Sequence, residues 1–137
     1  MVKKTLIEMD KSQFQLYKEN ISSLLKFMIE NGYTSKPYPK IILNDKPQKE
    51  KVLISTGYYD PENKTVVIFT NGRAIKDCLR SAAHEFIHHK QNIEGRLGNG
   101  AYEGQRITDD KKLIMLEAES FLKGNIGFRK WTESIKR

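Results

Sequence analysis

Apolar side chains recur every three or four residues along the first well-patterned segment, from Lys11 to Glu30. This spacing gathers them on one helical face, so the pattern predicts an amphipathic helix over this range. Asp10 stands where an N-cap residue is expected, and Asn31-Gly32 follows the last turn. The apolar positions of the predicted face are Phe14, Tyr17, Ile21, Leu24, Leu25 and Met28.

Three short segments in the middle of the chain have strand character. Ile41–Leu43 is a short apolar run that follows a proline-containing loop. Val52–Tyr59 and Thr65–Thr70 are rich in the β-branched and aromatic residues that strands favour. Asp60–Lys64, between them, contains the Asp, Pro and Asn residues typical of turns. The last two segments are therefore expected to form a β-hairpin.

Two further helices are predicted in the second half of the chain. Ala74–Ile93 carries apolar residues at helical spacing, and the glycine-rich segment Asn92–Gly104 after it is expected to be an exposed loop. A third helix is predicted from Asp109 or Asp110 to Lys123, with Gly124 as its stop. The apolar residues of the tail, which are expected to pack back on the body, are Ile126, Phe128 and Trp131.

The order of helix, strands, helix, loop and helix predicts a single α+β domain over residues 1–137. A composition of 38% hydrophobic and 30% charged residues fits one soluble domain and excludes collagen-like or low-complexity chains. The net charge of +7 is compatible with acidic partners such as nucleic acid. The lysines are scattered, however, which is typical of an ordinary solvated surface, so nucleic-acid binding has weak support.

Membrane insertion and disulfide bonding are both disfavoured by the sequence. No segment approaches the roughly 20 apolar residues of a membrane helix. Glu8 and Lys11 interrupt any signal-peptide core near the basic N-terminus. A single cysteine, Cys78, excludes an internal disulfide and a cysteine-only zinc cage. The chain is therefore expected to stay in the cytoplasm, or in the host cytoplasm if a phage encodes it.

His84-Glu85-Phe86-Ile87-His88 forms an H-E-x-x-H motif within the second predicted helix. Residues four apart lie on one helical face with Cβ atoms about 5–6 Å apart, so both imidazoles can reach one zinc ion at about 2.0–2.1 Å. Glu85 flanks the same face, where its carboxylate can contact a water held by the metal. The spacing indicates metal-assisted hydrolysis. A surface histidine pair that binds no metal is the alternative.

The third protein ligand that catalytic zinc normally takes must come from elsewhere. His89 is the last histidine and points about 100° away from His88, so it is expected to be a surface residue or a partner of Glu85. Cys78 lies too close to His84 on the same helix to close the site. Glu117 and Glu119, inside the apolar stretch Leu113–Phe121, remain. Only one of these two glutamates can face the histidines, because residues two apart diverge by about 200°.

Two histidines in this motif, with a glutamate from a following helix, resemble the gluzincin branch of zinc metallopeptidases. The small size is similar to that of the minigluzincins and of short phage-encoded H-E-x-x-H proteins, and the likeness covers about Lys51 to Glu133. In that family a strand before the active-site helix forms the edge of the cleft, the place that Thr65–Thr70 takes here. A glutamate followed three residues later by a small residue is the second motif, which Glu117 and Ser120 match with serine in place of alanine.

The resemblance implies a small zincin-like domain with one Zn²⁺ per chain, held by His84, His88 and Glu117. Glu119 stays the alternative third ligand, because Phe121 stands where the family often has a polar residue. Glu85 would be the general base that takes a proton from water attacking a peptide bond. Tyr102 is a candidate donor to the oxyanion. The Thr65–Thr70 strand could bind an extended peptide along its edge.

A zinc-dependent peptidase acting on a peptide or protein is thus the expected function. The first alternative is a nucleic-acid-associated protein with a structural or latent zinc site. Another is a peptidase that acts on DNA-bound proteins, and a third is a virion or regulatory binding protein built on the same scaffold. The sequence makes no prediction of the cleavage preference or the oligomeric state.

Overall fold

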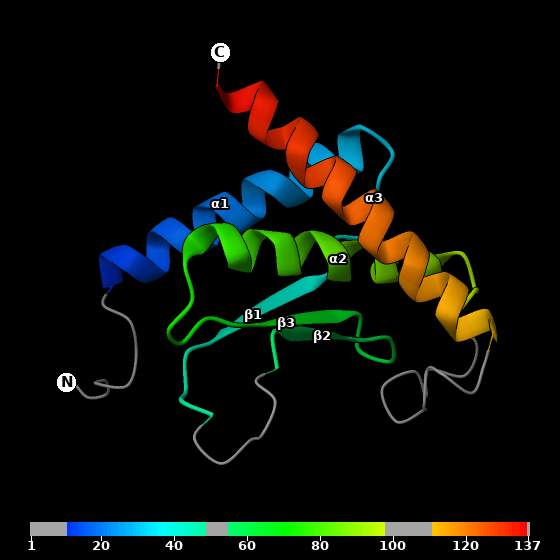
Figure 1. Cartoon of the computed structure of the whole chain (residues 1–137), viewed down its shortest axis with the longest axis horizontal. Helices are drawn as coiled ribbons and strands as arrows, with labels where there is room; N and C mark the ends of the chain where they lie inside the picture. Colours follow the sequence, from blue (N-terminus) through cyan, green and yellow to red (C-terminus); the bar gives the residue numbers. More distant parts are fainter. Residues whose placement is uncertain (1–10, 49–54, 98–110, 137) are drawn as a thin grey trace.

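Residues 11–48, 55–97 and 111–136 are described by the computed structural model. This part of the chain contains three helices and a small three-stranded sheet, which confirms the α+β class (Figure 1). The elements in chain order are α1 (Lys11–Glu30), β1 (Lys40–Asn44), β2 (Gly57–Asp60), β3 (Thr65–Phe69), α2 (Ile75–Ile93) and α3 (Lys111–Ile135).

The first helix has the predicted bounds. The buried face of α1 consists of Tyr17, Ile21, Leu24, Leu25 and Met28. Gly32 ends the helix with φ of +82°, a left-handed conformation that glycine adopts without a Cβ penalty. The N–H of Tyr33 then bonds the carbonyl of Met28 at 2.8 Å, which satisfies a backbone acceptor of the last turn.

The sheet has the order β1-β3-β2, with β3 in the centre. Strands β2 and β3 pair antiparallel, with Gly57 opposite Ile68, so the predicted hairpin is confirmed, although its first strand begins only at Gly57. Val52–Ile54 lies outside the described residues. β1 pairs parallel with the other edge of β3, with Lys40 opposite Thr65.

The expectation that Thr65–Thr70 forms the open edge of the cleft is wrong. Its backbone is paired on both sides, by β1 and by β2, so β3 has no edge free for a peptide. The continuous run of buried residues Thr65–Ile68 is typical of an interior strand with both faces covered. Among the described strands it is β2 that lies at the outer edge next to α2.

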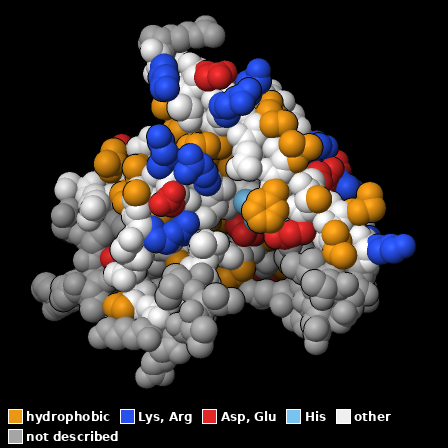
Figure 2. Space-filling model, viewed as in Figure 1, with side chains coloured by type: hydrophobic (Ala, Val, Ile, Leu, Met, Phe, Trp, Pro, Cys, Tyr) orange, Lys and Arg blue, Asp and Glu red, His pale blue; other side chains and the backbone are white. Residues whose placement is uncertain are grey.

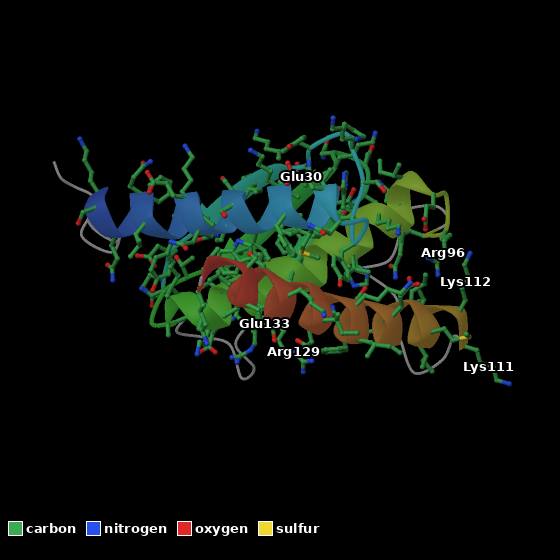
Figure 3. The ribbon with its side chains drawn as sticks, turned by 90° about the horizontal axis from the view of Figure 1, so that it is seen from above. Glu30, Arg96, Lys111, Lys112, Arg129 and Glu133 are labelled. Carbon is green, nitrogen blue, oxygen red and sulfur yellow. The ribbon has the colours of Figure 1, made fainter. Side chains whose placement is uncertain are left out.

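Helix α2 lies between the sheet and the other two helices (Figure 1). Helices α1 and α3 both pack on α2, and Figure 1 shows them inclined in opposite directions; the view from above separates them on either side of α2 (Figure 3). The most extensive helix contact is between α2 and α3. The core therefore forms around α2, whose fully buried apolar side chains are Cys78, Ala82, Ala83, Phe86 and Ile87.

The prediction that Gly124 ends the third helix is wrong, because α3 continues through it to Ile135. A Cβ at Gly124 would lie 3.1 Å from the backbone of His84, so glycine permits the close approach of α3 to α2. This packing outweighs the weak helix preference of glycine. The tail does pack back as part of the helix: Phe128 and Trp131 are buried, whereas Ile126 is 39% exposed. The Trp131 indole donates to the Ser23 hydroxyl at 3.0 Å.

Gly124→Ala is expected to destabilise the protein, although alanine is the better helix former. The new methyl group would meet helix backbone, which cannot yield easily, and overpacking of this kind costs about 1–3 kcal/mol. Gly127→Ala is the matched control, because its Cβ would approach the mobile end of the Met28 side chain at 3.1 Å. Urea unfolding should show a lower midpoint for Gly124→Ala and no loss for Gly127→Ala. Equal midpoints for both variants would contradict the role given to Gly124.

Candidate metal centre

Two histidines on adjacent turns of α2 face α3. The His84 and His88 ring centroids are 4.9 Å apart with the rings nearly perpendicular. Helix α2 is amphipathic, with Asp77 in its first turn and Lys90 in its last, both favourable to the helix dipole. The side chain of His88 is 1% exposed and that of His84 is 15% exposed, so the pair lies at the base of an open site.

Glu117 on α3 completes the group. Its Oε2 lies 3.1 Å from Nε2 of His84, and its Oε1 lies 2.9 Å from Nε2 of His88. The ligand atoms of the three residues all lie within 4.8 Å of one another. Ligand atoms in a tetrahedral zinc site are about 3.3 Å apart, given bond lengths near 2 Å. These residues could therefore hold a metal ion with small adjustments.

The hydrogen bonds of His88 place its proton on the nitrogen that faces away from Glu117. The Gln91 side chain is held by bonds from its amide nitrogen to the Leu116 carbonyl at 3.0 Å and to Glu119 at 2.7 Å. Its amide oxygen therefore faces Nδ1 of His88, at 2.8 Å. An amide oxygen only accepts, so Nδ1 carries the proton and the Ser120 hydroxyl, at 3.0 Å, can accept from it as well.

A neutral His88 in this tautomer turns the lone pair of Nε2 toward a carboxylate oxygen of Glu117. Two acceptors at 2.9 Å repel each other unless a proton or a cation lies between them. Burial opposes a charge on His88, but the bond to Glu117 and the nearby Glu85 outweigh it and raise the His88 pKa. The site thus favours a positive charge at the position where a metal ion would bind, which fits the metal-binding hypothesis.

Glu119 contacts other residues than Glu117 does. It bonds Gln91 at 2.7 Å, Arg96 at 2.9 Å and Lys123 at 3.0 Å. Figure 3 shows Arg96 near the amino-terminal end of α3. Burial would raise the Glu119 pKa, but these three donors lower it to about 2. The structure therefore brings Glu117, not Glu119, to the histidines, and gives Glu119 the task of holding Gln91.

The two glutamates can be compared directly by mutation. We expect Glu117→Ala to lower zinc affinity far more than Glu119→Ala, because only Glu117 contacts both histidine Nε2 atoms. Glu119 acts through Gln91, and loss of a group that orients a ligand costs about 10- to 100-fold in affinity. Competition titration with a chromogenic zinc chelator would measure both. The reverse ranking would assign the third ligand to Glu119.

Glu85 lies beside the metal-binding group and lines the same cleft. It is 7% exposed, and it is close enough to His88 for its charge to contribute to the raised pKa of that ring. The cleft has a volume of about 620 Å³. Its base is α2, one wall is the start of β2 at Thr56 and Gly57, and the other is α3 at Glu117, Phe121 and Asn125. On the face shown in Figure 2 a histidine surface is visible beside acidic and hydrophobic side chains.

His89 is a core residue, so the expectation of a surface histidine is wrong. It is fully buried. Its Nε2 donates to the Pro37 carbonyl at 2.6 Å, and its Nδ1 accepts from the Tyr59 hydroxyl at 2.7 Å. Asn92 donates in turn to the same hydroxyl oxygen at 2.9 Å. Burial lowers the His89 pKa, so the ring is neutral, as this donor and acceptor pattern requires.

Phe121, Gln91 and Ser120 contact the two histidines, a role that the sequence analysis did not predict for them. The Phe121 ring lies 4.5 Å from that of His84 and covers it from the α3 side. Gln91 and Ser120 each stand three residues after a predicted ligand, one helical turn away, which is a spacing that could have identified them. Tyr102, the candidate oxyanion donor, lies outside the described residues, as does most of the glycine-rich loop.

Searches against protein-family models, curated protein sequences and solved structures give no match. The site is therefore interpreted from its own geometry. None of the helices within the described residues combines the length and apolarity needed to cross a bilayer.

Proposed function

We propose that this chain is a zinc-dependent peptidase of the gluzincin type. The observation that carries the proposal is the convergence of His84, His88 and Glu117 at the cleft that His84, Glu85 and Glu117 line. Two imidazoles and one carboxylate are a donor set that zinc accepts in catalytic sites, which use three protein ligands and leave one position open. A structural zinc site, by comparison, is normally closed by four protein ligands.

The residues of the cleft have distinct tasks in this proposal. When bound, zinc would act as a Lewis acid that activates water and polarises the carbonyl of the scissile bond. Glu85 accepts the proton of the attacking water and later gives it to the leaving amine. His88 is held in one tautomer by Gln91, so its Nε2 stays available to the ion.

A peptide substrate needs a backbone partner as well as a catalytic group. Since β3 is paired on both sides, the edge beside the cleft is that of β2, where Thr56 and Gly57 form part of the wall. An extended peptide is therefore proposed to add to β2, with its scissile bond directed toward His84 and Glu117. Backbone pairing of this kind gives affinity with little dependence on side chains.

Chelator-sensitive proteolysis tests the function. The purified full chain, loaded with zinc, is incubated with denatured casein and with a mixed peptide library, in parallel with a sample stripped by chelator and one reloaded with zinc. Cleavage that is lost on stripping and regained on reloading is expected. A gel-shift salt series addresses the nucleic-acid alternative suggested by the +7 charge, because phosphate contacts produce a steep salt dependence. Salt-sensitive DNA binding without any proteolysis would favour that alternative.

A further inference from the structure

Two arginines line the same cleft on the side away from His88. Arg73 precedes α2, and Arg80 lies on α2 one turn before His84. Figure 2 shows basic side chains gathered around an acidic one over the amino-terminal half of α2, beside the exposed histidine. Neither arginine has a part in the proposed metal site. Their partners show that they have different tasks.

Arg73 is a fixed structural group. Its guanidinium donates to the carbonyls of Thr56 at 2.9 Å, Phe69 at 2.6 Å and Asp77 at 3.0 Å, and to the Ser81 hydroxyl at 2.6 Å. These acceptors belong to the strand ends and to α2, so Arg73 ties the wall of the cleft to its base. All four acceptors are neutral, so none of these bonds pairs the guanidinium with an anion.

Arg80 is held only weakly. Within the described residues its ion pair is with Asp77 at 3.4 Å, and the two side chains are 52% and 57% exposed. Such exposed pairs contribute little to stability and exchange partners readily. The guanidinium lies 5.4 Å from the centre of the Phe128 ring, which directs it across the groove between α2 and α3. Most of its hydrogen-bonding capacity is available to a ligand.

The position of Arg80 relative to the metal-binding group fits one substrate residue. Four residues along a helix correspond to a rise of about 6 Å, so Arg80 lies about that far along α2 from His84. One residue of an extended peptide spans about 3.3–3.6 Å, and its side chain adds further reach. A peptide whose scissile bond lies at the histidines would therefore bring the adjoining residue to Arg80.

The two arginines are the cationic residues in the described lining of the cleft, which also contains the carboxylates of Asp77, Glu85 and Glu117. Glu117 faces the two histidines, and Asp77 pairs with Arg80 at 3.4 Å. A carboxylate supplied by a ligand would therefore compete with Asp77 for Arg80. A guanidinium binds a carboxylate through two parallel N–H donors, which makes this recognition selective as well as attractive. Asn125, on the opposite wall, offers an additional amide donor.

We infer that Arg80 selects substrates with a carboxylate on the residue next to the scissile bond. The inference rests on the proposed peptidase function and adds a substrate class to it. The carboxylate is either the side chain of an acidic residue or the terminal carboxylate of a peptide. The two share one chemistry and differ only in the direction from which they reach the guanidinium.

Binding measured on a variant with strongly reduced turnover separates this inference from the hydrolysis itself. The probes are the blocked peptide Ac-Ala-Ala-Glu-Ala-Ala-NH₂, its glutamine and lysine counterparts, and tetraalanine with a free or an amidated C-terminus. Because every other position is alanine, each peptide can bind in more than one register. The test therefore covers an acidic residue on either side of the scissile bond. Dissociation constants are measured by NMR titration with zinc-loaded Glu85→Gln protein at low salt.

The expected result is about tenfold tighter binding of the glutamate peptide, or of the free-acid peptide, than of its neutral counterpart, as a charged hydrogen bond provides. Adding Arg80→Gln should bring the ratio close to one. The Arg80→Gln variant keeps its zinc. If the ion and not Arg80 bound the carboxylate, the acidic peptide would therefore still bind more tightly to this variant. Lys76→Gln is the matched control, because it removes an equal charge from an exposed position on α2 outside the cleft and should preserve the ratio.

Asp77→Asn provides a test of opposite sign. It removes the internal competitor for Arg80, so the preference for the acidic peptide should increase. Overturning results are a ratio that Arg80→Gln leaves unchanged, a preference for the lysine peptide, or no binding of any probe. Absence of cleavage by the wild-type chain, together with a preference that depends on Arg80, would instead contradict the proposed hydrolysis and leave the carboxylate site standing.

Discussion

Replacing His84 or His88 with alanine is expected to abolish stoichiometric zinc binding. The wild-type chain should retain about one zinc per molecule after desalting, since three ligand atoms converge within 4.8 Å. Each variant loses one of the three ligands that the described part of the chain brings together. The loss in affinity should exceed the 10- to 100-fold that removal of a supporting hydrogen-bond partner causes.

Metal analysis by mass spectrometry and a thermal shift with added zinc measure this prediction in two independent ways. A ligand that binds only the folded state stabilises it by about 2.7 kcal/mol at 100 times its dissociation constant. Zinc should therefore raise the melting temperature of the wild type and leave that of the two variants nearly unchanged. Retention of a full equivalent of metal by either variant would contradict the assignment of the site.

His89→Gln is the matched histidine control. Both ring nitrogens of His89 are occupied, by the Tyr59 hydroxyl and the Pro37 carbonyl, so this ring is directed into the core and not toward the metal-binding group. Its replacement is expected to lower stability, because buried partners lose their bonds, at a cost of about 1–3 kcal/mol. The zinc content of the folded fraction should remain near one. Comparison of the three histidine variants thereby distinguishes loss of metal binding from loss of stability.

The helices and the hairpin could be predicted because their signals are local. In α1, the apolar spacing gave both ends of the helix, and the turn residues of Asp60–Lys64 gave the β2–β3 connection. The H-E-x-x-H spacing likewise placed two ligands on one face, because the geometry of a helix needs no tertiary information. Those features follow from neighbours within four residues along the chain.

Other features depend on contacts between distant segments. Gly124 reads as a helix stop, but its place against the His84 backbone decides that α3 continues. His89 is followed by the charged Lys90 and resembles a surface residue, yet the carbonyl of Pro37, 52 residues away, accepts a hydrogen bond from its ring. The order of the strands also could not be read locally, because β1 reaches β3 past the intervening hairpin strand.

The choice between Glu117 and Glu119 shows the same limit within the candidate site. Both glutamates stand in one apolar stretch, and their relative directions exclude that both face α2 in the same way. The two glutamates differ in their neighbours: Glu119 lies beside Arg96 and Lys123, whereas Glu117 lies beside the two imidazoles. The sequence contained all of these residues but not their distances.

Glu85→Gln distinguishes a working peptidase from a latent or scaffold protein. Glu85 is not one of the three converging ligands, so its replacement should leave the zinc content unchanged. Glutamine has nearly the same size and can still donate and accept hydrogen bonds at this buried position. Thermal stability should therefore change little, in contrast to the effect expected for the ligand variants.

The rate of hydrolysis should nevertheless fall by about 10²–10⁴, because an amide cannot take a proton from the attacking water. The assay is cleavage of denatured protein and of peptides that carry an acidic residue, with zinc-loaded enzyme at a fixed concentration. Glu85→Asp is the informative companion: it keeps a carboxylate but shortens the reach by one carbon, so an intermediate rate is expected. Chelator-sensitive cleavage that persists at the wild-type rate in Glu85→Gln would show that another group is the base. If the wild-type chain binds zinc and cleaves none of these substrates, the latent or scaffold alternatives are favoured. Glu85 would then not act as a general base, because no water would be attacking a peptide bond.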